Sequence, residues 1–413
     1  MPKTKTTSSE RGGNSVIGPA ALAILIWAGS LKETLLFSWV PADLTLLMAA
    51  LVGLSIINSR VRGGAAGQAV VAPYAIFVAL FLPAVLLTQL PTSYANSKIV
   101  TLFTITLVLA IAPFYLLRSV RQRQVFLFTL TVLGILAAAN LVLAPTVVEG
   151  SLGGRLVLEG SNTIAVSRVV FAAVVVLLVG STIKGQTARR RILMSAGAVA
   201  LTLIATLTGS RGPVVAAAVA LAVVLMTAVA YRKYRVRAIL GFVAVAGIGL
   251  WYVLQSSQSE GVARIVGSLT GEEGGVPDAR VSIWTYALQL IEAKPFGRGW
   301  GSFDFAGAPY PHNLLLEIGV EAGLIVLAVV IVLLVATIVR GSRVATDWQT
   351  TALFGLFVFA LANAMVSADL NGNRLLTVTA FAVWAVTYTK RKEFGDEALL
   401  PSSTPRSMSL RSA

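Results

Sequence analysis

The sequence predicts an all-α integral membrane protein with about twelve transmembrane helices, and three observations support this class. The 413-residue chain is 56% hydrophobic and only 12% charged, and its mean hydropathy is +0.82. Apolar runs of about 20 residues, long enough to cross a bilayer as a helix, recur along the chain. Short basic clusters separate these runs, as is typical of multi-pass membrane proteins.

Twelve apolar ranges are the predicted transmembrane helices. In chain order they are 16–31, 42–58, 71–90, 99–117, 124–145, 163–183, 192–208, 213–231, 237–256, 313–339, 349–368 and 374–389. Lys and Arg gather in alternate connections between them. Because positively charged connections stay on the cytoplasmic side, this alternation predicts that both termini are cytoplasmic.

The predicted organisation has three parts. A cytoplasmic N-terminal tail covers residues 1–15, a polytopic membrane domain covers 16–392, and a disordered cytoplasmic tail covers 393–413. The membrane domain carries one long outer loop, 257–312, whose middle from Asp278 to Lys294 has helical apolar spacing. The glycine-rich stretch Gly297 to Gly301 that follows predicts a tight, closely packed turn.

Charge and composition exclude several functions. The net charge of +15 lies in short clusters between apolar runs, which indicates membrane topology rather than nucleic-acid binding. The absence of cysteine excludes disulfides and thiolate metal sites, and a single histidine argues against a histidine-rich metal site. We therefore expect no cofactor. No internal repeat is visible, so nothing in the sequence indicates a repeat-built transporter.

His312 is the one histidine of the chain, and it closes the long outer loop immediately before an apolar helix that begins at Leu314. The ordinary pKa of histidine lies near neutral, so this side chain can act as a general base toward a hydroxyl group. The alternative is a solvated residue at a helix start.

Two outer arginines are candidate anion ligands. Arg211, in Thr208–Pro213, lies at a helix start whose backbone N–H groups would join it in a phosphate site. It would otherwise close a tight hairpin and snorkel to lipid headgroups. Arg280 lies in the first turn of the loop helix, where a bound anion would offset its unfavourable interaction with the helix dipole. Its alternative is an ion pair with Asp278, Glu272 or Glu273.

Three further arginines are candidate substrate contacts. Arg168 falls inside the sixth predicted helix, where a buried guanidinium needs a carboxylate or an anionic ligand. Arg298 lies in the glycine turn, where it would contact ligand or position the loop backbone. Arg155, in a shorter outer loop, would contact ligand or remain solvated.

Polar residues in the last helices complete the candidate site. Asn313, Glu317 and Glu321 recur every four residues and share one helix face. We expect the two carboxylates to hold the arginines or to line a solvated cavity, with Glu317 nearer the substrate and Glu321 structural. Asp369 and Arg374 bracket the last outer turn and are expected to pair, with Asn371 and Asn373 building that turn.

Three motifs in this order resemble a known family. They are Thr208-Gly-Ser-Arg-Gly-Pro213; Arg280 with Trp284 and then Lys294-Pro-Phe-Gly-Arg-Gly-Trp-Gly301; and Pro311-His-Asn-Leu-Leu-Leu-Glu-Ile-Gly319 continuing to Glu321 and Gly323. The stretches Glu159–Thr163 and Asp369–Arg374 are weaker echoes. The chain is similar to the O-antigen ligase and polysaccharide polymerase superfamily of bacterial membrane proteins.

This resemblance implies a metal-independent inverting glycosyltransferase in the cytoplasmic (inner) membrane. It would transfer a glycan from undecaprenyl diphosphate to an acceptor hydroxyl of a glycan or glycolipid on the outer face. Arg211 and Arg280 would hold the donor diphosphate, and His312 would activate the acceptor or orient the diphosphate. Apolar grooves between helices would hold the polyprenyl chain among the membrane lipids.

Two alternatives remain open from the sequence. The nearer one is a Wzy-type polymerase, whose acceptor is another lipid-linked repeat unit. The other is a transporter of polysaccharide or lipid-linked sugar, which predicts ionisable residues spread through the middle of the bundle. In this sequence they concentrate at the outer edge and in the outer loop, which favours surface chemistry.

Overall fold

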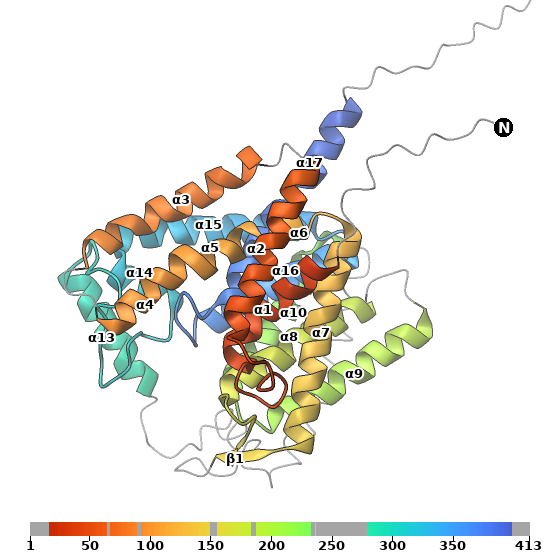
Figure 1. Cartoon of the computed structure of the whole chain (residues 1–413), viewed down its shortest axis with the longest axis horizontal. Coiled ribbons are helices and arrows are strands. Elements are labelled where there is room, and N and C mark those ends of the chain that lie inside the picture. Colours follow the sequence, from red (N-terminus) through yellow and green to blue (C-terminus); the bar gives the residue numbers. More distant parts are fainter. Residues whose placement is uncertain are drawn as a thin grey trace, which may run out of the picture.

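The computed structural model describes residues 16–63, 67–88, 92–148, 155–182, 187–232, 236 and 279–398. The described chain is almost entirely helical (Figure 1). Its one sheet is the antiparallel hairpin of β1 (Thr146–Val148) and β2 (Arg155–Val157), with Thr146 opposite Val157 and Val148 opposite Arg155. The predicted all-α class is therefore confirmed for this part of the protein.

The helices of the N-terminal half follow the predicted apolar ranges. They are α1 (Ile17–Leu31), α2 (Leu44–Gly63), α3 (Gly67–Leu86), α4 (Ser93–Thr101), α5 (Leu107–Ile111), α6 (Pro113–Leu116), α7 (Val120–Leu143), α8 (Thr163–Thr182), α9 (Ala188–Thr206) and α10 (Arg211–Thr227). A π-helical segment, η2 (Leu102–Thr106), joins α4 to α5, and a 3₁₀ turn, η3 (Val229–Tyr231), follows α10.

The C-terminal helices are α13 (Ala279–Ala293), α14 (Leu314–Glu321), α15 (Gly323–Val344), α16 (Trp348–Ala364) and α17 (Arg374–Ala398). The outer-loop helix predicted over 278–294 is thus present as α13. The predicted helix 237–256 and the outer-loop residues 257–278 lie outside the described residues, as do the tails 1–15 and 399–413.

Four helical segments of the described chain are long and apolar enough to cross a membrane. They are Ser93–Leu116, Val120–Leu143, Thr163–Thr182 and Gly323–Val344. The helices Ile17–Leu31, Leu44–Ser59, Arg211–Thr227 and Trp348–Ala364 are apolar but shorter. These segments support a multi-pass membrane protein, while the number of twelve transmembrane helices stays a prediction.

One boundary prediction is wrong. The range 313–339 is not one helix, because α14 ends at Glu321 and α15 starts anew at Gly323, whose φ is +86°. The backbone of Phe296 packs so closely on Gly323 that an added Cβ would lie 2.5 Å from the Phe296 carbonyl carbon. The disordered tail predicted from residue 393 stays a prediction, and α17 continues as far as Ala398. The first proline after Arg374 is Pro401, so no proline interrupts the helix earlier.

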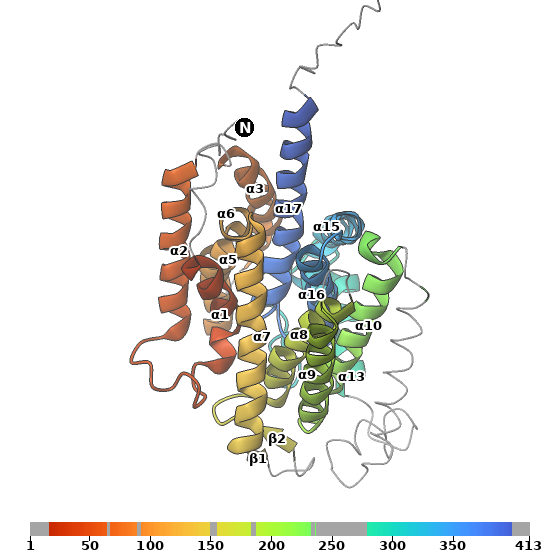
Figure 2. The same cartoon turned by 90° about the vertical axis from the view of Figure 1, so that its right-hand side faces the viewer.

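The core lies around α8 and α16. Their side chains are buried along most of their length, and α8 packs against α7, α9, α10 and α16. Figure 2 shows the α1–α2 connection and the β1–β2 hairpin at one end of the molecule, with the C-terminal end of α17 at the other. The segments predicted to be on the outer side therefore share an end. Which side of a membrane that end faces stays a prediction.

Candidate functional site

His312 lies in the turn that leads into α14, and its backbone is in the left-handed region with a φ of +54°. Asn313 caps the helix: its Oδ1 accepts from the backbone N–H groups of Leu315 and Leu316 at 3.0 and 3.1 Å. Its Nδ2 donates to the Met365 carbonyl at 3.0 Å. Trp284 on α13 donates to the Pro311 carbonyl at 3.0 Å. The histidine is therefore placed by bonds on both sides of it.

The imidazole of His312 is half-buried, with the ring of Tyr310 edge-on at a centroid distance of 4.5 Å. Burial lowers the pKa of His312 from its ordinary value, and the positive charge of Arg280 lowers it further. The negative charge of Asp369 opposes this shift of the pKa. A histidine with a lowered pKa is neutral near pH 7, which is the form that accepts a proton.

Arg280 lies in the first turn of α13, as predicted, and its side chain is half-buried. Its electrostatic effect on His312 indicates that the two side chains share one site. The alternative partners Asp278, Glu272 and Glu273 lie outside the described residues.

Arg168, on α8, is buried at 7% exposure, and its direct hydrogen-bond partner is neither a carboxylate nor an anion. Its Nη2 donates to Asn373 Oδ1 at 2.9 Å, so its direct partner is an amide, while the carboxylate of Asp369 acts on the guanidinium through its charge. Asn373 in turn donates from Nδ2 to the Asp369 carbonyl at 2.8 Å. Asn371 and Asn373 thus do more than build a turn, because they connect it to α4 and α8.

Asp369 and Arg374 do not form the predicted pair. Asp369 Oδ2 accepts from the hydroxyl of Tyr94 on α4 at 3.1 Å, and its Oδ1 accepts from the Gly372 N–H at 2.7 Å. Arg374 Nη1 donates to the Leu25 carbonyl on α1 at 3.1 Å. The carboxylate of Asp369 is therefore held by Tyr94 on α4 and by the backbone of its own turn.

Glu317 and Glu321 bind a lysine instead of the predicted arginines. Lys98 Nζ on α4 lies 2.5 Å from Glu317 Oε1 and 2.6 Å from Glu321 Oε2. The lysine side chain is 1% exposed and both carboxylates are at 0%. Glu317, which we expected to contact substrate, is enclosed, and it also accepts from the Leu370 N–H.

Lys98 is the residue that sequence reasoning missed. It lies just before a predicted helix, where a lysine is ordinarily assigned to snorkelling toward headgroups. Tyr94 and Lys98 are four residues apart and share a helix face, but both residue types are common at the ends of membrane helices, so the sequence contains no specific signal.

The glycine turn is closely packed, as predicted. Gly297, Gly299 and Gly301 all have positive φ, and a Cβ on Gly299 would lie 2.7 Å from the Thr88 backbone nitrogen. Arg298, half-buried, is positioned through its backbone N–H, which donates to the Val320 carbonyl at 2.9 Å. Trp300 Nε1 donates to the Phe81 carbonyl at 3.3 Å, and the Trp300 ring lies 4.9 Å from Lys98 Nζ.

Arg211 is the first residue of α10, as predicted, and Ser210 is its N-cap residue. Gly212 lies against the turn before α17, since a Cβ there would be 3.3 Å from Val366 Cγ2. Val366 follows Met365, whose carbonyl Asn313 holds. The start of α10 and the His312 turn therefore meet the same short segment. Arg155 lies on β2 by its backbone, and its side chain lies outside the described residues.

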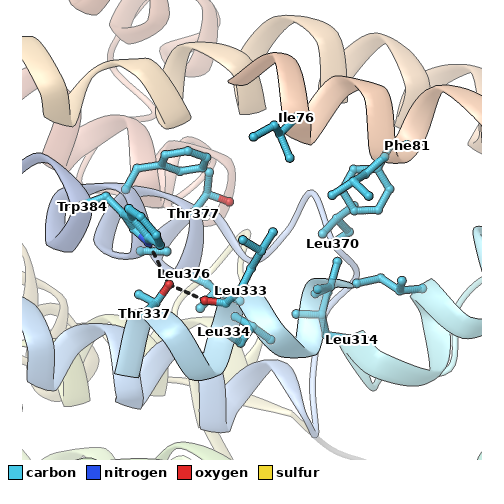
Figure 3. A pocket seen from close by; sticks show the side chains of 15 residues that line it. Ile76, Phe81, Leu314, Leu333, Leu334, Thr337, Leu370, Leu376, Thr377 and Trp384 are labelled. Atoms are coloured by element: carbon cyan, nitrogen blue, oxygen red, sulfur yellow. Dashed lines mark hydrogen bonds between the residues drawn. The ribbon is translucent and has the colours of Figure 1, made fainter. Parts of the chain in front are cut away.

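An apolar cavity of about 240 Å³ begins beside the turns that carry His312 and Asp369 (Figure 3). Leu314 and Leu370 line one end, directly after Asn313 and Asp369. Thr337 on α15 and Trp384 on α17 lie toward the other end, where Trp384 Nε1 donates to Thr337 Oγ1 at 2.9 Å. α3, α14, α15 and α17 contribute the lining.

In the part of the chain that the structure describes, no group of three or more His, Asp or Glu side chains could hold a metal ion. The groups that these contacts bring together around His312 are its imidazole, the charges of Arg280 and Asp369, and the rings of Tyr94 and Tyr310. Such a set can accept one proton and stabilise negative charge at the same place.

Residues 196–331 match a family model described as O-Antigen ligase. This segment includes Arg211, Arg280, Arg298, His312 and Asn313, with Glu317 and Glu321. Neither the curated proteins nor the solved structures contain a match to the chain. This segment is therefore similar to the O-antigen ligase family, in agreement with the motifs of the sequence.

Proposed function

We propose that this protein is a glycosyltransferase of the ligase type. It transfers a glycan from undecaprenyl diphosphate to an acceptor hydroxyl at the outer face of the cytoplasmic membrane. The observation that carries the proposal is the turn that fixes His312 against Tyr310 at the start of α14, where burial and the charge of Arg280 lower the pKa of the imidazole. A neutral base beside a guanidinium suits a reaction that deprotonates an alcohol and releases a diphosphate.

In the proposed reaction His312 takes the proton of the acceptor hydroxyl. The acceptor oxygen forms a bond to the anomeric carbon of the donor from the face opposite the diphosphate. The bond between that carbon and the phosphate oxygen breaks, and undecaprenyl diphosphate leaves with the electron pair. The anomeric configuration is inverted, and charge accumulates on the leaving oxygen.

Arg280 and Arg211 stabilise that charge in this proposal. Arg280 acts on the same site as His312, and Arg211 stands at a helix start whose neighbour Gly212 touches the turn that Asn313 holds. Guanidinium groups form paired hydrogen bonds to phosphate, and the N-terminus of α10 adds backbone donors. Arg298, Arg168, Arg155 and Asn313 remain proposed substrate contacts.

The apolar cavity supports a lipid-linked donor. It starts at Leu314, two residues after His312, and it runs between α3 and α15 with an apolar lining. A polyprenyl chain whose diphosphate lies at the arginines would place its first isoprene units there. The hydrophobic effect that holds apolar groups out of water would hold this part of the donor.

The test is a transfer assay with the purified full-length protein in lipid nanodiscs. Wild type should move glycan from the undecaprenyl-diphosphate donor to an added acceptor, and His312→Ala should lose about 100-fold or more of the rate. Full transfer by His312→Ala would refute the base. Donor supplied without a second acceptor distinguishes the alternatives, because chain growth under that condition would establish a polymerase and reject the ligase proposal.

A further inference from the structure

α4 contributes a buried lysine to this region, and the proposed chemistry does not use it. Lys98 Nζ is within 2.6 Å of both Glu317 and Glu321, and none of the three side chains is more than 1% exposed. A buried ion pair is costly to desolvate, so a fold can often be built as well with apolar residues. The presence of the lysine therefore calls for an account of what it holds.

The two carboxylates that bind Lys98 belong to the helix that carries the site. Glu317 and Glu321 follow Asn313 by one and two turns on α14. Asn313 caps that helix, and His312 immediately precedes it. Two short ionic bonds on one face fix both the position and the rotation of α14 relative to α4.

Lys98 also holds the turn that carries Asp369. The carbonyl oxygen of Lys98 accepts from Asn371 Nδ2 at 2.7 Å. Glu317 accepts from the Leu370 N–H, with distances of 3.1 Å to Oε1 and 3.0 Å to Oε2. The residue next to Leu370 is Asp369, whose charge acts on His312. One lysine and its partner thus hold the two segments that supply the base and its acidic neighbour.

A second residue on the same face of α4 reaches the site directly. Tyr94, one turn before Lys98, donates to Asp369 Oδ2 at 3.1 Å. Its ring stacks on Tyr310 at a centroid distance of 6.2 Å, and Tyr310 lies against His312. Lys98 Nζ lies 5.6 Å from the centre of the Tyr94 ring. A displacement of Lys98 would therefore reach His312 by two separate chains of contacts.

We infer that Lys98 is a positioning residue for the transfer reaction: it binds α4 to α14 and to the Asp369 turn, and so sets His312 against Asp369. The inference rests on the proposed function for its effect on the rate. Lys98 lies outside residues 196–331, the segment that matches the family model. It contributes no group to the substrate, and its effect passes through Glu317.

Two variants test it in the full-length protein. Lys98→Met removes the ammonium. Lys98→Met/Glu317→Gln/Glu321→Gln removes all three charges while keeping similar shapes, so that no carboxylate is left buried without its cation. Both should lower kcat by about tenfold or more with a change in donor KM of less than about threefold, since the donor arginines are untouched. Lys32→Met, which removes an exposed lysine paired with Asp43, is the control and should leave both constants unchanged.

A second readout does not depend on activity. The protein has one histidine, so isotope-labelled imidazole gives one set of NMR signals that needs no assignment. The Tyr310 ring should displace the His312 ring-proton signals in wild type, and both variants should return them toward the values of free imidazole. If the folded triple variant keeps wild-type kcat and wild-type signals, Lys98 is only structural and the inference fails. If wild type transfers no glycan, the proposed function fails, while the imidazole signals still decide the positioning.

Discussion

Arg168 and Asn373 face each other inside the helical domain, with Arg168 Nη2 donating to Asn373 Oδ1 at 2.9 Å. The Nε of Arg168 is buried and makes no hydrogen bond within the described residues. When a buried guanidinium has an amide as its side-chain acceptor, removal of that amide lowers the stability of the folded protein. Since Asn373 also holds the Asp369 carbonyl, it joins α8 to the turn beside His312.

Asn373→Leu should therefore destabilise the protein by about 3 kcal/mol, because it keeps the size of the side chain and leaves Arg168 buried without this acceptor. Thermal unfolding in nanodiscs, followed by circular dichroism, measures the change. Asn96→Leu is the matched control: it alters an exposed asparagine on α4 and should shift the midpoint little. Equal midpoints for Asn373→Leu and wild type would contradict the role of this amide.

The rate of transfer should fall with decreasing pH through the pKa of His312. Because burial and Arg280 lower that pKa, the acid limb of kcat/KM should lie below the ordinary histidine range, with a plateau at neutral pH. Protonation removes the base, so the activity is present above the pKa and lost below it. A pH profile from pH 4.5 to 8 checks this, and an acid limb above the ordinary range would contradict the environment described.

Arg280→Gln removes a positive charge that lowers the pKa of His312, so that pKa should rise. The imidazole NMR titration of the single histidine measures it without a substrate. Asp369→Asn removes the opposing negative charge and should lower the same pKa. A shift of equal sign in the two variants would show that the titration reports general loosening of the site.

Arg211→Lys and Arg280→Lys keep the charge but lose the planar pair of donors that fits a phosphate. Each should reduce kcat/KM by about 10- to 100-fold, from the loss of one charge-assisted hydrogen bond of about 1.5–3 kcal/mol. Arg189→Lys, on an exposed part of α9, is the control and should have no effect. Unchanged turnover in both site variants would argue against diphosphate binding.

Gly299→Ala should cost about 2 kcal/mol or more. Its φ is +90°, and a Cβ would lie 2.7 Å from the Thr88 backbone nitrogen, which no rotation of a side chain can relieve. Gly53→Ala on α2 is the contrasting change, because a Cβ there meets nothing within 4 Å and alanine favours helix. A lower unfolding midpoint is expected for the first variant, and an equal or higher one for the second.

Ala380→Phe should fill the apolar cavity and weaken the binding of long-chain donors. Ala380 lines the cavity from α17, and a phenyl ring would take up much of its 240 Å³. The KM of an undecaprenyl donor should rise more than that of an otherwise identical donor with a short prenyl chain. Equal effects on the two donors would mean that the cavity does not hold the lipid.

The helices could be predicted from sequence because hydropathy is a local property. Apolar runs such as 124–145 and 163–183 coincide with α7 and α8 within a few residues. The break between α14 and α15 could not, since the long apolar run continues through it. At this break the backbone of Phe296 and Gly297 packs on Gly323, and the Pro295 carbonyl accepts from the Leu324 N–H at 2.8 Å.

The residues of the candidate site also differ in how far they could be predicted from the sequence. His312, Asn313, Arg211 and Arg280 stand in local motifs at helix starts, so their neighbourhood could be predicted from the chain itself. The partner of Glu317 could not, because Lys98 is 219 residues away and belongs to no motif. Asp369 and Arg374 illustrate the opposite error: closeness in sequence suggested a pair, whereas Tyr94 and Leu25 hold them apart.

The break at Gly323 separates α14, which follows His312, from α15, one of the candidate membrane-crossing helices. Only 17% of the most apolar stretch of α15 is buried inside the protein, so most of that stretch is exposed on the protein surface. If α14 and α15 formed one continuous helix, a tilt of that helix in response to bilayer thickness would also move His312. Because Lys98 and Glu317 bind α14 to α4 and to the Asp369 turn, we expect His312 to keep its position when the bilayer thickness changes. The rate of the proposed transfer should then differ little between nanodiscs of short-chain and long-chain lipids.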